Sequence, residues 1–327
     1  MNSHCKKEMT SPETKDKSMN TIITFAGLDV SKARLDTHAS GNHREDTNTP
    51  KGHAALILHL RSLPNPRVIC EATGGYEKAI VAALLAEGIE VSVVQPGRVR
   101  HFAEAKGWLA KNDRIDARLL SQFGQNIDPR LEVASTPESV RLREMLEYRR
   151  ITGEQISKST NRLELASGYL KQGLEAQIAA LQADLIRVGN DIAAHLAAHA
   201  ALDAKAKRMT QLKGVGPVLA ATLLAYLPEL GGIEDKQIAS LVGVAPHPKD
   251  SGTSKFKRRV AGGREQVRKV LYMAALSGAR SNPVFKAFYQ RLKIQKGKPH
   301  KVAIVAVMRK MLTVLNKLLA NPQFSLA

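Results

Sequence analysis

Four acidic residues stand where strand or helix patterns begin or end. Asp29 follows the apolar run ITFAGL, and Glu71 ends the run VIC. Asp113 and Asp116 lie at the start of a helical pattern, KNDRIDARLL. Their spacing of i and i+3 puts these two on one helix face, with Cβ atoms about 5–6 Å apart. Because strand ends at one edge of a sheet can converge on such a helix, we expect the four carboxylates to gather.

A cluster of carboxylates suits a hard metal ion. Mg²⁺ takes carboxylate oxygens and leaves positions open for phosphate. Two such ions can stabilise the attacking and leaving oxygens of phosphoryl transfer. The alternative is that each acid has a local task, since Asp29 could cap a turn and Asp113 could N-cap a helix. The four acids in this order favour a magnesium site.

A serine in a cationic segment is a second candidate for chemistry. Ser251 lies in PKDSGTSKFKRR, which we expect to be a turn between helices. A serine hydroxyl can attack a phosphodiester if it is aimed at the phosphorus and the phosphate charge is neutralised. Most serines in loops cap turns instead, and Ser254 is nearly as good a candidate. The nearby cations predicted to contact nucleic acid are Lys255, Lys257, Arg258, Arg259 and Arg264.

The stretch LKGVGPVLAATLLAYL has the form of a helix-hairpin-helix, with Pro217 at the first position of its second helix. Gly214 and Gly216 would let backbone N–H groups approach a phosphate, and the helix dipole would favour the anion. Such a contact reads no bases. A tight turn between helices would look the same, but the neighbouring Lys213 favours nucleic-acid binding.

The charge of the chain points to a polyanionic partner. The 327 residues carry a formal charge of +19. Between Lys249 and Lys310 there are 17 Lys and Arg against 2 acids, which leaves only +4 for the remaining residues. Aromatic residues make up 4%, so an extended base-stacking platform is not indicated. We therefore expect the last third to contact the backbone of a duplex or a folded RNA.

Composition and length favour two domains with a helical connector. Strands in 21–48 precede alternating helices and strands, and this order predicts a mixed sheet with helices on its faces. The stretch 137–205, rich in Leu, Ala and charged residues, predicts two long helices, either an antiparallel or intermolecular coiled coil or an ordinary connector. The predicted parts are a disordered arm (1–20), an α/β catalytic domain (21–130), the helical connector (131–205) and an all-α domain (206–327).

Other features exclude several classes of protein. No apolar run approaches the roughly 18 residues of a membrane span, and the polar N-terminus lacks a signal peptide. Two cysteines, Cys5 and Cys70, are too few for a disulfide framework or a zinc cluster. We expect a cytoplasmic protein.

Taken together, these segments resemble the DEDD transposases of a bacterial insertion-sequence family, described as bridge-RNA-guided recombinases. The resemblance covers roughly residues 22–320. Its landmarks, in chain order, are GLDVSK, CEATGGY, KNDRIDARLL, LKGVGPVLAATLLAY, LVGVAPHPKDSGTSK, GGREQVRKVLYMAAL and KVAIVAVMRKML.

The resemblance implies an N-terminal domain of the RuvC-like, RNase H class whose four acids bind Mg²⁺. It implies a C-terminal transposase domain whose Ser251 joins covalently to a DNA 5′ phosphate. The active site would be composite in a dimer or tetramer, with acids from one protomer and the serine from another. An element-encoded structured RNA would pair with target and donor DNA, so that the protein reads backbone shape.

Two other functions stay open on the sequence. A RuvC-like junction-resolving nuclease would use water as nucleophile and would need the acids but not Ser251. A non-enzymatic, basic helix-hairpin-helix DNA-binding protein would need neither.

Overall fold

The computed structural model describes residues 22–108, 113–246, 250–251, 254–255 and 260–325, with only the backbone for 113–115, 250–251 and 254–255. The predicted arm at 1–20 lies outside the described residues. The chain divides into two compact units, Met1–Ala134 and Ser135–Ala327.

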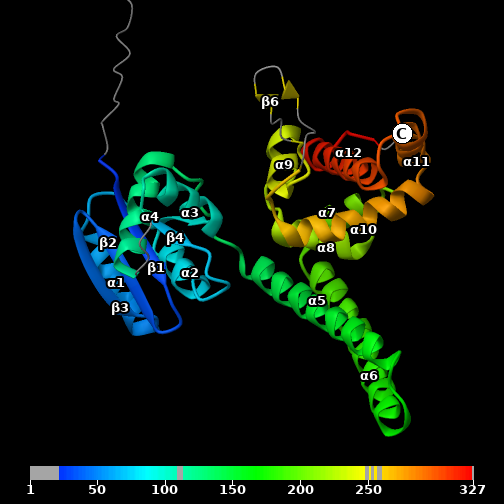
Figure 1. Ribbon diagram of the computed structural model, residues 1–327, viewed down its shortest axis with the longest axis horizontal. Helices are drawn as coiled ribbons and strands as arrows, with labels where there is room; N and C mark the ends of the chain where they lie inside the picture. The colour runs from blue at the N-terminus through cyan, green and yellow to red at the C-terminus, as the bar shows by residue number, and fades with distance from the viewer. Residues whose placement is uncertain (1–21, 109–112, 247–249, 252–253, 256–259, 326–327) are drawn as a thin grey trace, which may run out of the picture. The chain divides into compact units, whose positions relative to one another are not determined.

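The first unit is built on a five-stranded mixed sheet (Figure 1). Its spatial order is β3-β2-β1-β4-β5, in which β1, β2 and β3 pair antiparallel and β4 and β5 continue parallel to β1. The strands are β1 (Thr24–Val30), β2 (Arg34–Ala39), β3 (Asn42–Thr47), β4 (Pro66–Glu71) and β5 (Glu90–Val94). The predicted mixed α/β region is confirmed.

Alternation along the strands creates two apolar faces. On β1, Ala26, Leu28 and Val30 lie in one buried cluster with apolar side chains of α1 (Pro50–Arg61) and α2 (Lys78–Ala86). The opposite face carries Phe25 and Ile69, which pack with α3 (Pro96–Ala105) and α4 (Asp113–Ile127). Helices therefore cover both faces of the sheet.

The second unit is helical, as predicted, and begins with a long helical hairpin. The helices α5 (Pro137–Leu163) and α6 (Gly168–Ala198) lie side by side (Figure 1). They run antiparallel, since the Tyr148 hydroxyl donates to Asp184 at 2.6 Å while Ser159, farther along α5, donates to the earlier Gln177 at 3.2 Å. Coiled-coil packing between protomers stays a prediction.

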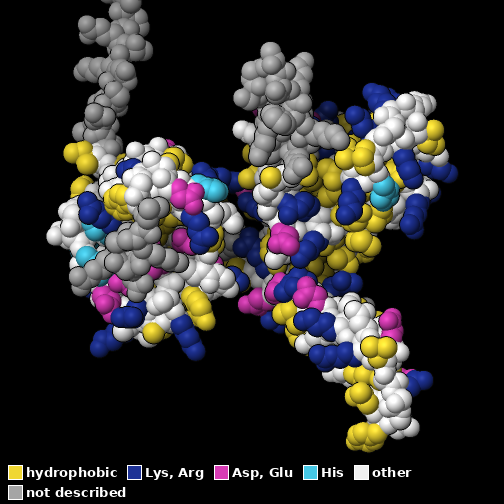
Figure 2. Space-filling view, in the orientation of Figure 1, with side chains coloured by type: hydrophobic (Ala, Val, Ile, Leu, Met, Phe, Trp, Pro, Cys, Tyr) yellow, Lys and Arg dark blue, Asp and Glu magenta, His cyan; other side chains and the backbone are white. Residues whose placement is uncertain are grey.

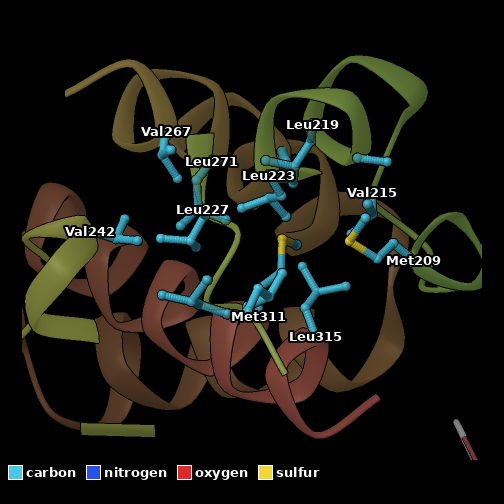
Figure 3. Packing of buried hydrophobic residues seen from close by; sticks show 14 of the residues in the cluster. Met209, Val215, Leu219, Leu223, Leu227, Val242, Val267, Leu271, Met311 and Leu315 are labelled. Carbon is cyan, nitrogen blue, oxygen red and sulfur yellow. The ribbon is translucent and has the colours of Figure 1, made fainter. Parts of the chain in front are cut away.

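A single large core holds the rest of this unit together. Residues from α7, α8, α9, α10 and α12 meet in it, among them Met209, Leu223, Leu271 and Met311 (Figure 3). The remaining helices are α7 (Ala200–Thr210), α8 (Pro217–Tyr226), α9 (Asp235–Val242), α10 (Glu265–Ser281), α11 (Pro283–Gln290), the π-helix η1 (Arg291–Gln295) and α12 (His300–Ala320).

The predicted all-α character of 206–327 fits the helices of this unit. The helix α11 continues directly into the π-helix η1. Within the described part of the chain, no helix has the length and apolar character needed to cross a membrane.

Candidate active site

Asp29 and Glu71 lie at the same edge and on the same face of the sheet. Leu28 of β1 is paired with Cys70 of β4 in a parallel ladder, so each acid is the next residue on its strand. By alternation, Asp29 shares its face with Phe25, and Glu71 shares it with Ile69. That face is the one covered by α3 and α4.

The helix α4 brings the other two acids to this edge. Ser121 in the middle of α4 donates to the Phe25 carbonyl at 2.7 Å, and a Cβ on Gly27 would lie 1.9 Å from the Ala117 carbonyl oxygen. Earlier residues of α4 therefore lie over later residues of β1. Because the helix runs antiparallel to β1, its first turn, with Asp113 and Asp116, lies toward Asp29.

The closeness of α4 to β1 depends on glycine. The Cβ of any other residue at Gly27 would overlap the backbone of α4 at Ala117 and Ser121. A second glycine, Gly124, faces Ile69 and Phe25 in the same way. These two positions let the helix pack directly on the strands that carry Asp29 and Glu71.

The electrostatics of the edge are those of gathered negative charge. Burial raises the pKa of the Cys70 thiol, and the charges of Glu77, Asp29 and Glu71 raise it further. Burial also acts to raise the pKa of Glu77, but hydrogen bonds from Thr73 and from backbone N–H groups outweigh it and lower that pKa. Glu77 thereby holds the TGGY turn that follows Glu71.

The donor set at this edge fits a hard divalent cation. Carboxylates from two adjacent strand ends and one helix start would supply oxygen ligands, the type that Mg²⁺ prefers. Among the side chains that the structure describes, no three of His, Cys, Asp and Glu are close enough to hold a metal ion. The side chain of Asp113 is not among them. The four-acid magnesium site therefore stays a prediction.

Asp36 is an acid of this face that the sequence analysis missed. It lies directly opposite Asp29 in the β1–β2 ladder, so both side chains share a face, and it is 7% exposed. Its carboxylate contacts His43 Nε2 at 3.0 Å. The alternation in RLDTHA, with Leu35 on the opposite face, is the signal that could have placed Asp36 beside Asp29.

Asn48 ties together the loops that follow the two strand-end acids. Its amide nitrogen donates to the carbonyls of Ser31, at 2.9 Å, and Tyr76, at 3.3 Å. Its amide oxygen bonds His53 Nε2 at 2.7 Å. Since Ser31 follows Asp29 by two residues and Tyr76 ends the turn after Glu71, Asn48 links the backbone beyond both acids.

The serine segment contains a short β-hairpin. Asp250–Ser251 (β6) and Ser254–Lys255 (β7) pair antiparallel, with Asp250 opposite Lys255 and Ser251 opposite Ser254. The turn predicted from the sequence thus contains two paired strands. The two candidate serines occupy one cross-strand pair, so the backbone alone does not choose between them.

The predicted helix-hairpin-helix region is a tight turn between α7 and α8. Gly214 has φ of +107°, and a Cβ there would lie 2.7 Å from the Gly278 Cα on α10. A glycine is therefore required at position 214, because any side chain there would overlap α10. Gly216 and Lys213 are exposed, and no atom lies within 4 Å of a Cβ built on Gly216. Both residues are therefore open to a ligand.

Comparisons with known proteins match both units. Residues 206–290 match the family described as "Transposase IS116/IS110/IS902 family", and residues 26–166 match the DEDD transposase family of IS110 elements. The two matches together support an IS110-family transposase. This transposase is therefore an enzyme that cleaves and joins DNA.

Named relatives extend the similarity over most of the transposase. It is 28% identical to a pilin gene-inverting protein from Moraxella lacunata over 303 residues, 89% of this chain and 94% of the relative. The Moraxella bovis protein of the same name is 27% identical over the same shares. An uncharacterized 44.8 kDa protein of insertion element IS116, from Streptomyces clavuligerus, is 33% identical over 35% of this chain and 29% of its own length.

The transposase carries a cationic surface around α11 and η1. After Glu265 the sequence contains 12 Lys and Arg and no Asp or Glu. Figure 2 shows Lys and Arg side chains over the region of α11, with no acidic side chain among them. Exposed members on and beside η1 are Arg291, Lys293, Lys296, Lys298 and Lys301.

Aromatic side chains lie within this cationic surface. Arg291 and Lys310 both lie over the Phe288 ring, at 5.3 and 4.9 Å from its centroid. The Tyr289 hydroxyl is 2.7 Å from His300 Nδ1. The contacts with the Phe288 ring anchor two long cationic side chains that would otherwise lose more entropy on meeting a phosphate.

The structure describes the side chain of Arg264 but not those of the other cations predicted to contact nucleic acid around Ser251. Lys257, Arg258 and Arg259 lie outside the described residues, and Lys255 is described by its backbone alone. Arg264 forms a two-pronged ion pair with Glu229, at 2.6 and 2.7 Å. Its guanidinium is thus already engaged within the transposase.

Proposed function

We propose that this transposase is an RNA-guided DNA recombinase, in which Asp29, Glu71, Asp113 and Asp116 hold Mg²⁺ and Ser251 is the nucleophile. One observation carries the proposal. Two adjacent strand ends and the first turn of α4, far apart in sequence, bring their acids to one edge of the sheet. This convergence supports assigning the first unit to the RuvC-like, RNase H class.

When bound, Mg²⁺ would neutralise the phosphate charge and stabilise the oxygens of the reaction. The protein's own part is to orient the acids. Gly27 sets the distance of α4 from β1, and Asn48 and Glu77 hold the loops after Asp29 and Glu71. Such outer partners orient the ligands of a metal site and tune its affinity.

The proposed chemistry is a phosphoryl transfer that conserves the energy of the DNA phosphodiester bond, because a phosphoserine bond replaces it. The Ser251 Oγ attacks a DNA phosphorus, a 5′ phosphoserine bond forms, and the bond from phosphorus to the 3′ oxygen breaks. The serine proton is taken up by a base, and the leaving oxygen ends as a 3′ hydroxyl. Attack by another 3′ hydroxyl then releases the serine and joins the strands. The name of the Moraxella relatives, which describes the inversion of a gene, suits such a rearrangement.

Nucleic acid would lie along the second unit. The exposed Gly216 and Lys213 support backbone contact at the helix-hairpin-helix, and the cationic surface around α11 and η1 supports a phosphate track. Lys255, Lys257, Arg258 and Arg259 would neutralise the phosphate at Ser251. Target choice would rest with the element's structured RNA, since neither surface implies base reading.

The helical hairpin α5–α6 would serve assembly of the homo-oligomer with composite active sites. Its tip exposes apolar residues to solvent, with Leu165 at 94% and Tyr169 at 93%. Exposed side chains of this size favour a partner of the same kind.

The test is to trap the protein on nicked DNA in the presence of Mg²⁺ and the element's RNA. Wild-type protein and Ser254→Ala should give a covalent adduct that mass spectrometry maps to residue 251. Neither Ser251→Ala nor Asp29→Asn should form it.

Other outcomes would select the competing functions. Cutting by Ser251→Ala without any adduct would indicate a nuclease that uses water. DNA binding with no cleavage by any variant, wild type included, would indicate a binding protein. An adduct mapped to residue 254 would move the nucleophile within the hairpin.

A further inference from the structure

The two ends of the serine segment, 244–261, meet at three glycines. Gly243 and Gly263 have φ of +75° and +79°. A Cβ on Gly263 would lie 2.2 Å from the Gly243 nitrogen, and one on Gly243 would lie 2.1 Å from the Gly262 carbonyl oxygen. Backbone therefore touches backbone where the segment leaves α9 and where it enters α10.

Hydrogen bonds close this junction. The Arg264 N–H donates to the Leu241 carbonyl at 2.9 Å, and the Arg268 guanidinium donates to the Gly262 carbonyl. Val244 donates back to Ala239 at 2.9 Å. Both ends of the serine segment thus have defined backbone partners.

The Arg264 side chain ties the junction to a third element. Its guanidinium donates to both carboxylate oxygens of Glu229 and, at 2.9 Å, to the Tyr226 carbonyl at the end of α8. Three of the five N–H donors of an arginine are thereby used inside the protein. The Glu229 side chain is only 9% exposed, so water screens this ion pair weakly.

The end of α8 is itself held in place. Arg143 of α5 donates from Nε to the Ala225 carbonyl at 2.6 Å, and its guanidinium lies over the Tyr226 ring. The chain of contacts therefore runs from α5 through α8 and Arg264 to the base of the serine segment.

We propose that Arg264 and Glu229 are positioning residues that set the direction in which the β6–β7 hairpin presents its serine. This inference rests on the proposed role of Ser251. Phosphoryl transfer needs the attacking oxygen in line with the leaving oxygen, and a displacement of about 1 Å can lower the rate about 100-fold. Arg264, predicted from the sequence to contact nucleic acid, instead acts through the hairpin.

The experiment compares Arg264→Gln, Glu229→Gln and the double variant in the full chain. Lys269→Gln is the matched control, since it removes an exposed ion pair with Glu265 on the same helix. The rate of adduct formation at saturating DNA, the DNA concentration for half-maximal rate and the melting temperature are measured. Each single variant should lower the rate at least about tenfold with unchanged half-saturation. The double variant should be no slower than either single one, because both break the same contact.

Two results would overturn the inference. Weaker DNA binding by Arg264→Gln but not by Glu229→Gln would show a direct contact with nucleic acid. Wild-type rates in both single variants would show that the ion pair does not position the hairpin. If a Gln variant fails to fold, Arg264→Lys takes its place. It should react more slowly with unchanged half-saturation, and a change in half-saturation instead would contradict the proposal.

A readout without catalysis separates this inference from the proposed function. Amide hydrogen exchange at 241–245 and 260–264 should speed up in both Gln variants and not in Lys269→Gln, whether or not Ser251 is the nucleophile. Unchanged amide exchange in both Gln variants would contradict the proposal that the Arg264–Glu229 ion pair holds the base of the serine segment. The adduct could map to a residue other than Ser251 while amide exchange changes as expected. That result would overturn the proposed nucleophile but not the proposed role of the Arg264–Glu229 ion pair.

Discussion

At the scale of single residues, the site depends on groups that hold the acids as much as on the acids. Asn48 bonds the loops after Asp29 and Glu71, while Asp36 lies opposite Asp29 and contacts His43. Such residues would help to position the proposed metal ligands by holding the backbone around them.

Asn48→Ala should weaken metal binding. Loss of both amide hydrogen bonds frees the loops after Asp29 and Glu71, so the affinity for Mn²⁺, used as a probe for Mg²⁺, should fall about 10–100-fold. Titration calorimetry on the full chain measures this. The exposed Asn190 on α6 provides the control variant, Asn190→Ala, which should bind as wild type does. Equal affinities for the two variants would remove Asn48 from the site.

The buried His53 makes stability depend on pH. Burial lowers the pKa of His53 below its ordinary 6.5, so below that pH the unfolded chain binds more protons than the folded one. The free energy of unfolding should therefore fall as pH drops from 7.5 to 5.5. Urea unfolding of His53→Gln should show a smaller fall, whereas His101→Gln, whose side chain is 81% exposed, should keep the wild-type dependence. Identical pH profiles for all three proteins would contradict this assignment.

At the scale of elements, the approach of α4 to β1 decides whether the acids meet. The contact exists because Gly27 has no side chain, and the helix axis would have to move outward for any other residue. A shift of α4 moves Asp113 and Asp116 away from Asp29 together, since they share its first turn.

Gly27→Ala should destabilise the first unit by about 2 kcal/mol or more, because the new methyl group overlaps helix backbone that cannot rotate away. Urea unfolding measures the change. Gly97→Ala in α3 is the control, since no atom lies within 4 Å of its Cβ, and it should change stability by less than about 1 kcal/mol. A Gly27 variant as stable as the control would mean that α4 packs less closely than described.

At the scale of the whole molecule, charge is distributed unevenly. The last 62 residues hold no acid, whereas the acidic edge lies in the first unit. The positive charge of the second unit therefore attracts a DNA backbone, while the proposed metal ion would attract phosphate to the first unit.

Salt should weaken DNA binding steeply through counterion release. Changing Lys293, Lys296 and Lys298 together to Gln should flatten the plot of log affinity against log salt by about one unit for each lost phosphate contact. Filter binding at several salt concentrations between about 50 and 300 mM, where added salt increasingly screens exposed charges, measures the slope. The same change at Lys158, Lys171 and Lys205 removes equal charge from α5–α7. Equal slopes for the two triple variants would argue against a track along η1.

Much of this molecule could be read from local patterns. Alternation and turn residues placed the strands of the first unit, and apolar periodicity placed most helices. Asp29, Glu71, Asp113 and Asp116 were predicted as a site because each stands at or near the end of an element. The cationic last third was visible because charge adds up along a sequence without reference to a fold.

Contacts between distant residues were decided only by the tertiary structure. Asp36 became a neighbour of Asp29 through strand register, and Gly214 proved to be needed for packing against Gly278. Arg264 was predicted to contact nucleic acid, and the structure places Glu229, 35 residues earlier, beside it. A sequence carries the type and order of such groups. Which ones meet depends on how helices and strands pack, because that packing alone brings together residues that are distant along the chain.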